Sequence, residues 1–219
     1  MKLHGSLASP YVARVAFFAQ LKGIGLEPGM PAGGIKSEAY LAKNPMGKMP
    51  LLEVDGVVIP ESDVICEYLE DLHPGTGGLP GSPADRAVAR LLARIVDVYV
   101  WPPAHVLFDN MNPARRDAAA VTHATQSLTR GIGYLEHFVQ ASPFAAGVAL
   151  SLADCALIPA MEVLRKTLIP AFGLADPTTG SGRLARWSGA ISANPTASGF
   201  RQRFGAAFDV FLESIRKAG

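Results

Sequence analysis

Apolar and polar positions follow different periods in the two parts of this chain. In residues 1–80, short apolar runs alternate with stretches of helical spacing, which predicts a mixture of strands and helices. The expected strands are 2–5, 25–30, 51–54 and 57–60, and the expected helices are 10–22, 37–43 and 62–72. Their order, β-α-β-α-β-β-α, predicts a small mixed sheet with helices on its faces.

Local signals mark the ends of these elements. Asp55-Gly56 lies between two apolar runs and predicts a two-residue hairpin turn. Ser9-Pro10 precedes apolar positions at helical spacing. Serine caps a helix and proline fits its first turn, so this pair predicts a helix start.

Residues 84–219 have helical spacing throughout, broken only by turn residues. The expected helices are 86–101, 115–140, 151–168, 183–195 and 195–219. The Gly- and Pro-rich segment 74–83 has the composition of a linker. We therefore predict an α/β domain over 1–78, a linker over 79–83 and an all-α helical-bundle domain over 84–219.

The helix expected over 151–168 carries little charge on any face, which places it at the centre of the second domain. It opens with Ser151 and Asp154, spaced as a capping box in which each side chain binds the other residue's backbone N–H. Such a cap is worth about 0.5–2 kcal/mol. We interpret it as structural.

Composition narrows the classes of function. Hydrophobic residues make up 49% and charged residues 18% of the chain, a balance typical of an ordered globular protein. The net charge of +1 provides no basic footprint for nucleic acid or an anionic membrane. The N-terminus does not fit a secretory signal, and polar residues and a proline break the apolar stretch 142–164. We expect a cytoplasmic protein without a nucleic-acid or membrane partner.

The two cysteines, Cys66 and Cys155, lie far apart in the sequence and within apolar helical patterns. This placement favours buried thiols over a disulfide or a metal site.

The segment SPYV, residues 9–12, is the first candidate for chemistry. With cysteine at Ser9 and Val12 it would be a C-P-Y-C dithiol motif at the start of a thioredoxin-type helix. Without those sulfurs, a reactive sulfur has to arrive with the substrate. Ser9 is either a plain helix cap or a donor to an anion at the helix N-terminus, where free N–H groups favour negative charge.

Two further segments offer binding groups. Pro50 directly precedes an apolar strand, where a proline is tolerated and its peptide bond could be cis. That arrangement would free the backbone of Met49 to pair with an extended peptide. Ser62 is the expected N-cap of the next helix with Glu61 just outside it, and free N–H groups there suit a carboxylate.

Four segments in this order resemble the glutathione S-transferase superfamily, and together they span nearly the whole chain: SPYVARVAFFAQLKG, NPMGKMPLLEVDG, PESDVICEYLED and, beyond the linker, SLADCALIPAME. The resemblance is to cytosolic, serine-type bacterial, theta-like and zeta-like members. It implies a thioredoxin-like domain with a mixed four-stranded sheet that binds glutathione. It also implies a helical domain that supplies much of the electrophile pocket, and a homodimer.

The resemblance assigns roles to matching residues. Ser9 matches the catalytic serine. Met49 matches the backbone clamp on the cysteinyl part of glutathione, and Pro50 matches the cis-proline that follows it. Glu61 and Ser62 match the residues that hold the γ-glutamyl group. Lys48 matches a basic residue near the glycine end.

The second substrate is expected against apolar and aromatic residues near the serine and on the helix that Pro102-Pro103 should kink. These candidates are Leu7, Tyr11, Tyr99, Trp101, His105 and Phe108. Tyr11 is also a rival to Ser9, because some transferase classes hold the thiolate with a tyrosine hydroxyl. Its place two residues inside the helix favours the pocket wall.

The expected function is a glutathione transferase acting on a small hydrophobic electrophile, with glutathione as co-substrate and no metal. Isomerisation, dehalogenation or ether cleavage by the same thiolate remain alternatives. So does a non-catalytic, transferase-like binding module. The zeta-class isomerase segment reads S-S-C-x-W-R-V, and this chain lacks its cysteine and tryptophan.

Overall fold

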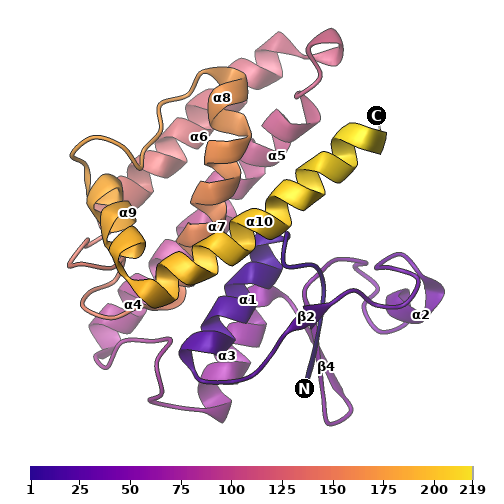
Figure 1. Ribbon diagram of the computed structural model, residues 1–219. Helices are drawn as coiled ribbons and strands as arrows, with labels where there is room; N and C mark the ends of the chain where they lie inside the picture. The colour runs from indigo at the N-terminus through magenta and orange to yellow at the C-terminus, as the bar shows by residue number, and fades with distance from the viewer. Residues whose placement is uncertain (219) are drawn as a thin grey trace.

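The computed structural model describes residues 1–218 and contains an α/β unit followed by a helical unit (Figure 1). The first unit holds strands β1 (Lys2–His4), β2 (Pro28–Gly29), β3 (Leu51–Val54) and β4 (Val57–Pro60), and helices α1 (Pro10–Leu21), α2 (Glu38–Leu41) and α3 (Ser62–Leu72). The second holds α4 (Pro83–Ile95), the π-helical turn η1 (Val96–Val100), α5 (Trp101–Asp109), the 3₁₀ turn η2 (Pro113–Arg115), α6 (Ala118–Phe138), α7 (Leu152–Lys166), α8 (Leu168–Phe172), α9 (Arg183–Ala193) and α10 (Pro195–Ala218). The predicted fold class is confirmed.

The sheet has the strand order β2-β1-β3-β4, with β1 and β2 parallel and the other pairs antiparallel. Leu3, Leu52 and Ile59 stand opposite one another across three strands and contribute to the core. The strand expected over 25–30 is reduced to β2, because Pro28 has no N–H to donate and glycine weakens a strand.

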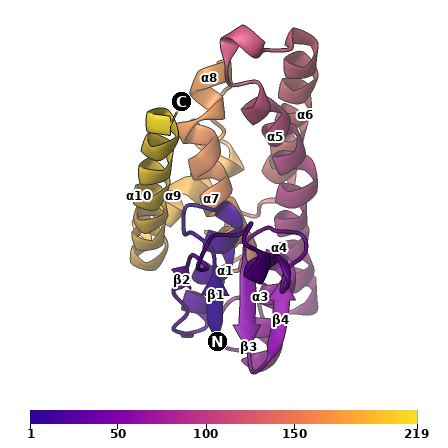
Figure 2. The ribbon, with the colours of Figure 1, turned by 90° about the vertical axis from the view of Figure 1, so that its right-hand side faces the viewer.

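Helix α1 lies at the centre of the molecule, between the sheet and α7, as Figures 1 and 2 show. Ser9 caps it and every residue from Val12 to Ala19 is buried, because the helix packs against α3 on one side and α7 on the other. Phe17 stacks on Phe200 of α10 with ring centroids 4.4 Å apart. The first helix therefore belongs to the core of both units.

The helix expected over 86–101, with a kink at Pro102-Pro103, is resolved into α4, η1 and α5. The irregularity precedes the prolines rather than following them. Neither proline has a backbone N–H, so the carbonyls of the preceding turn lose their usual helical donors and the turn widens. In the widened turn the Trp101 N–H donates to the Val96 carbonyl, five residues earlier, in a π-helical hydrogen bond. Gly131 of α6 packs against this turn, since a Cβ at this position would clash with the backbone carbonyl oxygen of Tyr99.

The continuous helical span Pro83–Asp109 is, within the described residues, the one helix long and apolar enough to cross a membrane on length and composition alone. Its most apolar window has a mean hydropathy of 1.2 and is 44% buried. The longest apolar stretch of the sequence, residues 142–164, is a different one and is interrupted by Ser151, Asp154 and Pro159. In this fold Pro83–Asp109 packs against α6 and α7, and a cytoplasmic location remains a prediction.

The segment between the units is held by Lys22, whose side chain is fully buried. Its ammonium donates to the carbonyls of His73, Thr76 and Gly77, and lies 2.6 Å from a Glu70 oxygen. Helix α4 begins at Pro83, the last residue of the expected linker. The domain limits 1–78 and 84–219, with a linker over 79–83, remain a proposal.

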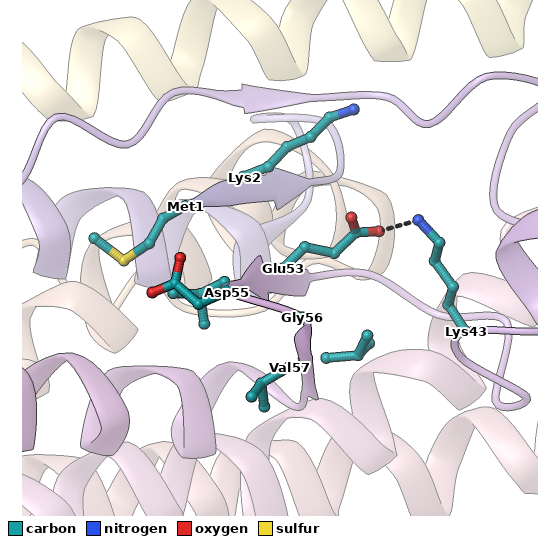
Figure 3. Close-up of a pocket in the computed structure, with 9 residues that line it drawn as sticks. Met1, Lys2, Lys43, Glu53, Asp55, Gly56 and Val57 are labelled. Atoms are coloured by element: carbon teal, nitrogen blue, oxygen red, sulfur yellow. Dashed lines mark hydrogen bonds and ion pairs between the residues drawn. The ribbon is translucent and has the colours of Figure 1, made fainter.

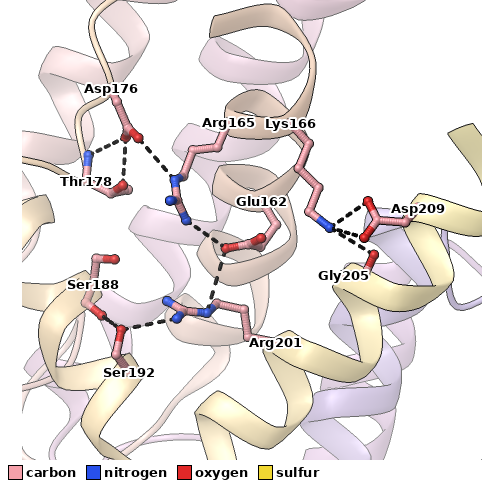
Figure 4. Close-up of polar contacts among 10 residues, drawn as sticks. All are labelled: Glu162, Arg165, Lys166, Asp176, Thr178, Ser188, Ser192, Arg201, Gly205 and Asp209. Carbon is pink, nitrogen blue, oxygen red and sulfur yellow. Dashed lines mark hydrogen bonds and ion pairs between the residues drawn. The ribbon is translucent and has the colours of Figure 1, made fainter. Parts of the chain in front are cut away.

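The central helix of the second unit is α7. Its capping box is present: the Asp154 carboxylate accepts from the Ser151 N–H at 2.8 Å and also from the Trp187 indole at 2.8 Å. Figure 4 shows the far end of α7, where Lys166 binds Asp209 of α10 and Glu162 lies between two arginines. Within the described residues, Cys66 and Cys155 are free and buried, as expected.

Candidate active site

A cleft of about 760 Å³ opens where the start of α1, the segment before β3 and the start of α3 face the α4–α5 helix. Its volume lies within the range of about 300–1,000 Å³ typical of small-molecule sites. The lining residues are Tyr11, Ile35, Lys36, Asn44, Gly47, Lys48, Met49, Pro50, Pro60, Glu61, Ser62, Asp63, Val64, Arg94, Asp97 and His105. Both units therefore build it.

The segment before β3 presents a backbone edge to this cleft. The Met49–Pro50 peptide bond is cis. The Lys48 carbonyl accepts from the Tyr40 hydroxyl at 2.6 Å and from the Asn44 amide at 2.9 Å, which fixes the loop. Lys48 itself is exposed and points its charge into a solvated region.

The start of α3 differs from the expectation by one residue. Glu61 is the N-cap, with φ 69° and ψ 119°, and Ser62 is the first helical residue rather than the cap. A positive φ is unfavourable for glutamate, costing on the order of 1–3 kcal/mol. The structure holds this conformation at the cleft wall, leaving Glu61 exposed and Ser62 buried. Such strain at a cleft indicates a functional position.

The buried ion pair between Arg14 and Asp97 supports the part of the cleft wall that contains Ser62. Arg14 of α1 donates to both carboxylate oxygens of Asp97 in η1, at 2.8 and 2.6 Å, and to the Ser62 hydroxyl at 3.2 Å. Burial alone lowers the pKa of Arg14, but the hydrogen bond to Asp97 and the negative charges around the guanidinium together outweigh it, and the pKa lies above its usual value. The same arginine lies 3.9 Å from Asp63, whose pKa burial raises.

Tyr11 lines the cleft from the second residue of α1. Its ring contacts Trp101 of α5, with centroids 5.7 Å apart, and the Arg14 guanidinium lies 5.8 Å from its centre. Burial, reinforced by the charge of Asp97, raises the pKa of Tyr11 to about 12. The phenol therefore stays protonated at neutral pH and acts as a hydrogen-bond donor.

Ser9 lies at the N-cap of α1, two residues before Tyr11, and is partly exposed. Its hydroxyl oxygen accepts from the Val12 N–H at 3.5 Å, and Ser9 is not among the residues that line the cleft. Because the oxygen is used as an acceptor, the hydroxyl proton is available for a ligand at the helix start.

His105 is the one predicted aromatic wall residue of the helical unit that reaches the cleft. It stacks on Trp101 with ring centroids 6.0 Å apart. Burial lowers the pKa of His105, and Lys48 nearby lowers it further while Asp109 opposes the shift. The imidazole is therefore mostly neutral at pH 7. Trp101 is buried and packs against the rings of both Tyr11 and His105.

The other expected wall residues lie elsewhere. Leu7 and Phe108 are partly buried against the core. Tyr99 is 49% exposed and packs edge-on against Tyr134 of α6, away from the cleft. The π turn contains one extra residue, which rotates side chains before it by about 100° relative to those after it. A regular helix drawn from the sequence could not show this rotation.

Sequence reasoning missed four residues that line the cleft, Lys36, Asp63, Arg94 and Asp97, and also Arg14, which is buried and binds Asp97. The sequence did contain a signal for the central pair. Arg14 is the single charge within the buried stretch 12–19, and Asp97 is the single charge within the apolar run 95–101. Charges on a buried stripe need a partner.

A second hollow of about 470 Å³ lies at the other end of the sheet, around the turn between β3 and β4 (Figure 3). Lys43 and Glu53 form an ion pair across it at 2.5 Å, and the hydrogen bond from Lys43 lowers the pKa of Glu53. These two charges therefore satisfy one another. Within the described residues, no group of His, Cys, Asp and Glu could hold a metal ion.

Comparisons with known proteins show the family to which the chain belongs. Residues 3–77 match the family described as glutathione S-transferase, N-terminal domain. The chain is 32% identical to probable glutathione S-transferase BZ2 of Zea mays, over 94% of this chain and 86% of that protein. It is 27% identical to a glutathione S-transferase of Pseudomonas putida, over 99% and 98% of the two chains.

Among solved structures, the fold is similar to that of maleyl pyruvate isomerase, described as a bacterial glutathione S-transferase of the zeta class. The TM-score is 0.73 at 25% identity, over 94% of this chain and 98% of the other. Sequence, fold and cleft lead to one conclusion: this chain is an enzyme of the glutathione S-transferase superfamily.

Proposed function

We propose that the cleft binds glutathione and that Ser9 keeps its sulfur as a thiolate for attack on a small hydrophobic electrophile. The observation that carries the proposal is that one cleft gathers the expected glutathione-binding residues Lys48, Met49, Pro50, Glu61 and Ser62. They come from two separate segments of the sequence and converge beside the start of α1.

The γ-glutamyl end of glutathione carries both an ammonium and a carboxylate. The N–H groups at the start of α3, with the Ser62 hydroxyl, suit the carboxylate. Glu61 and Asp63 suit the ammonium, and the Asp63 Oδ1 atom is buried without a hydrogen-bond partner among the described residues. A zwitterionic head group therefore matches this wall of the cleft.

The middle and the far end of the tripeptide match the opposite wall. An extended peptide binds a protein chain through paired backbone groups, and the Met49 N–H and carbonyl are the groups assigned here. Beyond them, Lys48 and Lys36 line the cleft and supply positive charge for the glycine carboxylate. At both ends of glutathione, the cleft therefore offers charges opposite to those of the ligand.

The energetics of activation are modest. A free thiol with a pKa of about 8.5 is only a few per cent ionised at pH 7. Lowering that pKa by about two units takes about 2.7 kcal/mol. A hydrogen bond to a charged group supplies about 1.5–3 kcal/mol and the helix dipole about 0.3–1 kcal/mol. The Ser9 hydroxyl and the start of α1 together suffice.

The test compares Ser9→Ala with Ser82→Ala. Both serines are N-caps followed by a proline, but Ser82 starts α4. We expect Ser9→Ala to lose most of its turnover of a generic aromatic halide, with retention on glutathione resin nearly unchanged. Ser82→Ala should lose only the stability of a helix cap, about 1 kcal/mol.

Unchanged turnover in Ser9→Ala would remove Ser9 from the mechanism. Retention on the resin by the unaltered protein, without turnover of a broad panel of electrophiles, would favour the binding-module alternative.

An isomerase is the second candidate, favoured by the similarity to a zeta-class maleyl pyruvate isomerase structure. Isomerisation uses the same thiolate, which adds to a double bond and is later released. Glutathione-dependent cis-trans isomerisation of a cis-α,β-unsaturated keto acid, without net consumption of glutathione, would identify this activity. Consumption of glutathione with each turnover would identify the transferase.

We also propose a homodimer in the cytoplasm. Both statements rest on the family, in which dimers and cytosolic members are typical. Light scattering on the purified protein would measure the oligomeric state, and a mass equal to one 23.1 kDa chain would contradict the dimer.

A further inference from the structure

Tyr11 is the cleft residue whose polar group the proposed function leaves unused. It lines the cleft beside the glutathione-binding segments, and its hydroxyl makes no hydrogen bond to any residue in the described range 1–218. The hydroxyl is also not among the buried side-chain atoms without a partner, so it is open to the cleft. A donor left free in a cleft is available to a substrate.

The Tyr11 ring is fixed in place by its surroundings. The buried Trp101 contacts the Tyr11 ring and also stacks on His105, so it supports from α5 the two rings that line the cleft. The Arg14 guanidinium lies near the ring and is itself held by Asp97. Packing and charge therefore hold the hydroxyl in position before any ligand binds, as preorganised catalysis requires.

The position of the ring indicates which of the two substrates lies beside Tyr11. Glutathione is assigned to Met49 and the start of α3, and its sulfur to Ser9 at the helix cap. Tyr11 instead contacts Trp101, a residue of the helical unit, where the electrophile is expected. The high pKa of the phenol keeps its proton in place, so the group can donate but does not itself become an anion.

We infer that the Tyr11 hydroxyl is a second catalytic donor, directed at the electrophile, and that it favours electrophiles in which an oxygen becomes negative as the thiolate adds. This inference rests on the proposed function, since it needs a glutathione thiolate in the same cleft. The substrate class is the α,β-unsaturated carbonyl compounds.

The step balances as follows. The thiolate sulfur forms a bond to the β-carbon, the π electrons of the C=C bond shift, and the carbonyl oxygen becomes an enolate oxygen. Tyr11 donates a hydrogen bond to that oxygen and keeps its own proton. Water then protonates the α-carbon, replacing the proton that left the thiol when it ionised. The product is a thioether, and nothing is oxidised or reduced.

The experiment compares two electrophiles in each of three proteins: the unaltered chain, Tyr11→Phe and Tyr134→Phe. One electrophile is an α,β-unsaturated ketone. The other is a benzyl halide, from which halide leaves without an oxygen gaining charge. Tyr134 lies on α6, outside the cleft, and provides the matched loss of a tyrosine hydroxyl.

Removing one preorganised donor typically lowers kcat by about 10²-fold or more. We expect Tyr11→Phe to lose about 10²-fold in kcat with the ketone, while the benzyl halide changes little and Tyr134→Phe retains both activities. Because phenylalanine keeps the ring and removes a hydroxyl with no described partner, the melting temperature should be unchanged.

An equal loss with both electrophiles would overturn the inference, because Tyr11 would then act on the sulfur or on the fold. No loss with either would overturn it too. The readout is the ratio of kcat with the ketone to kcat with the benzyl halide. This ratio tests Tyr11 whichever residue activates the thiol, because both reactions use the same thiolate. Turnover of neither electrophile by the unaltered protein would contradict the proposed function, and with it the role of Tyr11.

Discussion

Arg14 and Asp97 join two parts of the chain that are 83 residues apart in sequence. The arginine is 2% exposed, so the carboxylate of Asp97 is what makes its burial tolerable. The pair also positions Ser62, because the same guanidinium donates to its hydroxyl. Loss of the pair should therefore affect both folding and the proposed glutathione-binding wall.

We predict that Asp97→Asn destabilises the protein by about 3–5 kcal/mol, because it leaves the buried arginine charge uncompensated. Urea unfolding monitored by circular dichroism measures the change. The control is Glu67→Gln, which breaks the exposed pair with Arg90 and should cost less than about 1 kcal/mol. Similar losses in the two variants would show that the buried pair has no special role.

At the scale of single elements, η1 determines which residues of the α4–α5 helix reach the cleft. The turn directs Asp97 toward Arg14, whereas Tyr99 packs on α6. Helix α6 is fitted to this turn through Gly131, whose Cα lies against the Tyr99 carbonyl. The close approach holds the helical unit in the geometry that the cleft needs.

We predict that Gly131→Ala destabilises the protein by about 1–3 kcal/mol, because the added methyl would meet backbone that cannot move aside. Gly133→Ala is the matched control on the same helix. Its Cβ meets nothing within 4 Å, so it should stabilise the helix by about 0.5–1 kcal/mol. Thermal unfolding of both variants gives the comparison, and two changes of the same sign would contradict the packing argument.

Elements with local signals were predictable from the sequence. Ser9-Pro10 starts α1 and Asp55-Gly56 turns the hairpin, because each depends on the conformational preferences of adjacent residues. The capping box of α7 was predictable for the same reason. What could not be predicted depends on distant contacts or rare backbone geometry.

The start of α3 and the Arg14–Asp97 pair illustrate this limit. The positive φ of Glu61 moved the N-cap by one residue, and no sequence preference for glutamate indicates such a conformation. The pair required knowledge of which distant segment α1 would contact. The glutathione-binding residues were named through the resemblance, and their roles remain proposals.

At the scale of the whole molecule, Lys22 ties the segment that joins the two units. Its buried ammonium binds three carbonyls of that segment, and Glu70 connects it to Arg86 of α4. The cleft is built from both units, so a fixed connection keeps its two walls at a constant separation.

We predict that Lys22→Met destabilises the protein by about 3–5 kcal/mol, because Glu70 loses a buried partner, and makes the segment 73–83 sensitive to protease. Unfolding in urea and limited proteolysis measure the two effects. Lys43→Met, which removes an exposed ion pair with Glu53, should cost less than about 1 kcal/mol. Equal protease resistance in the two variants would argue against the anchor.

The central claim is that the start of α1 keeps a bound sulfur negatively charged. Ultraviolet titration of glutathione bound to the protein tests it directly, because the thiolate absorbs where the thiol does not. The account predicts that the bound thiol ionises with a pKa about two units below the value of about 8.5 for a free thiol, and that Ser9→Ala restores most of the difference. A bound thiol that ionises as it does in buffer would contradict the account.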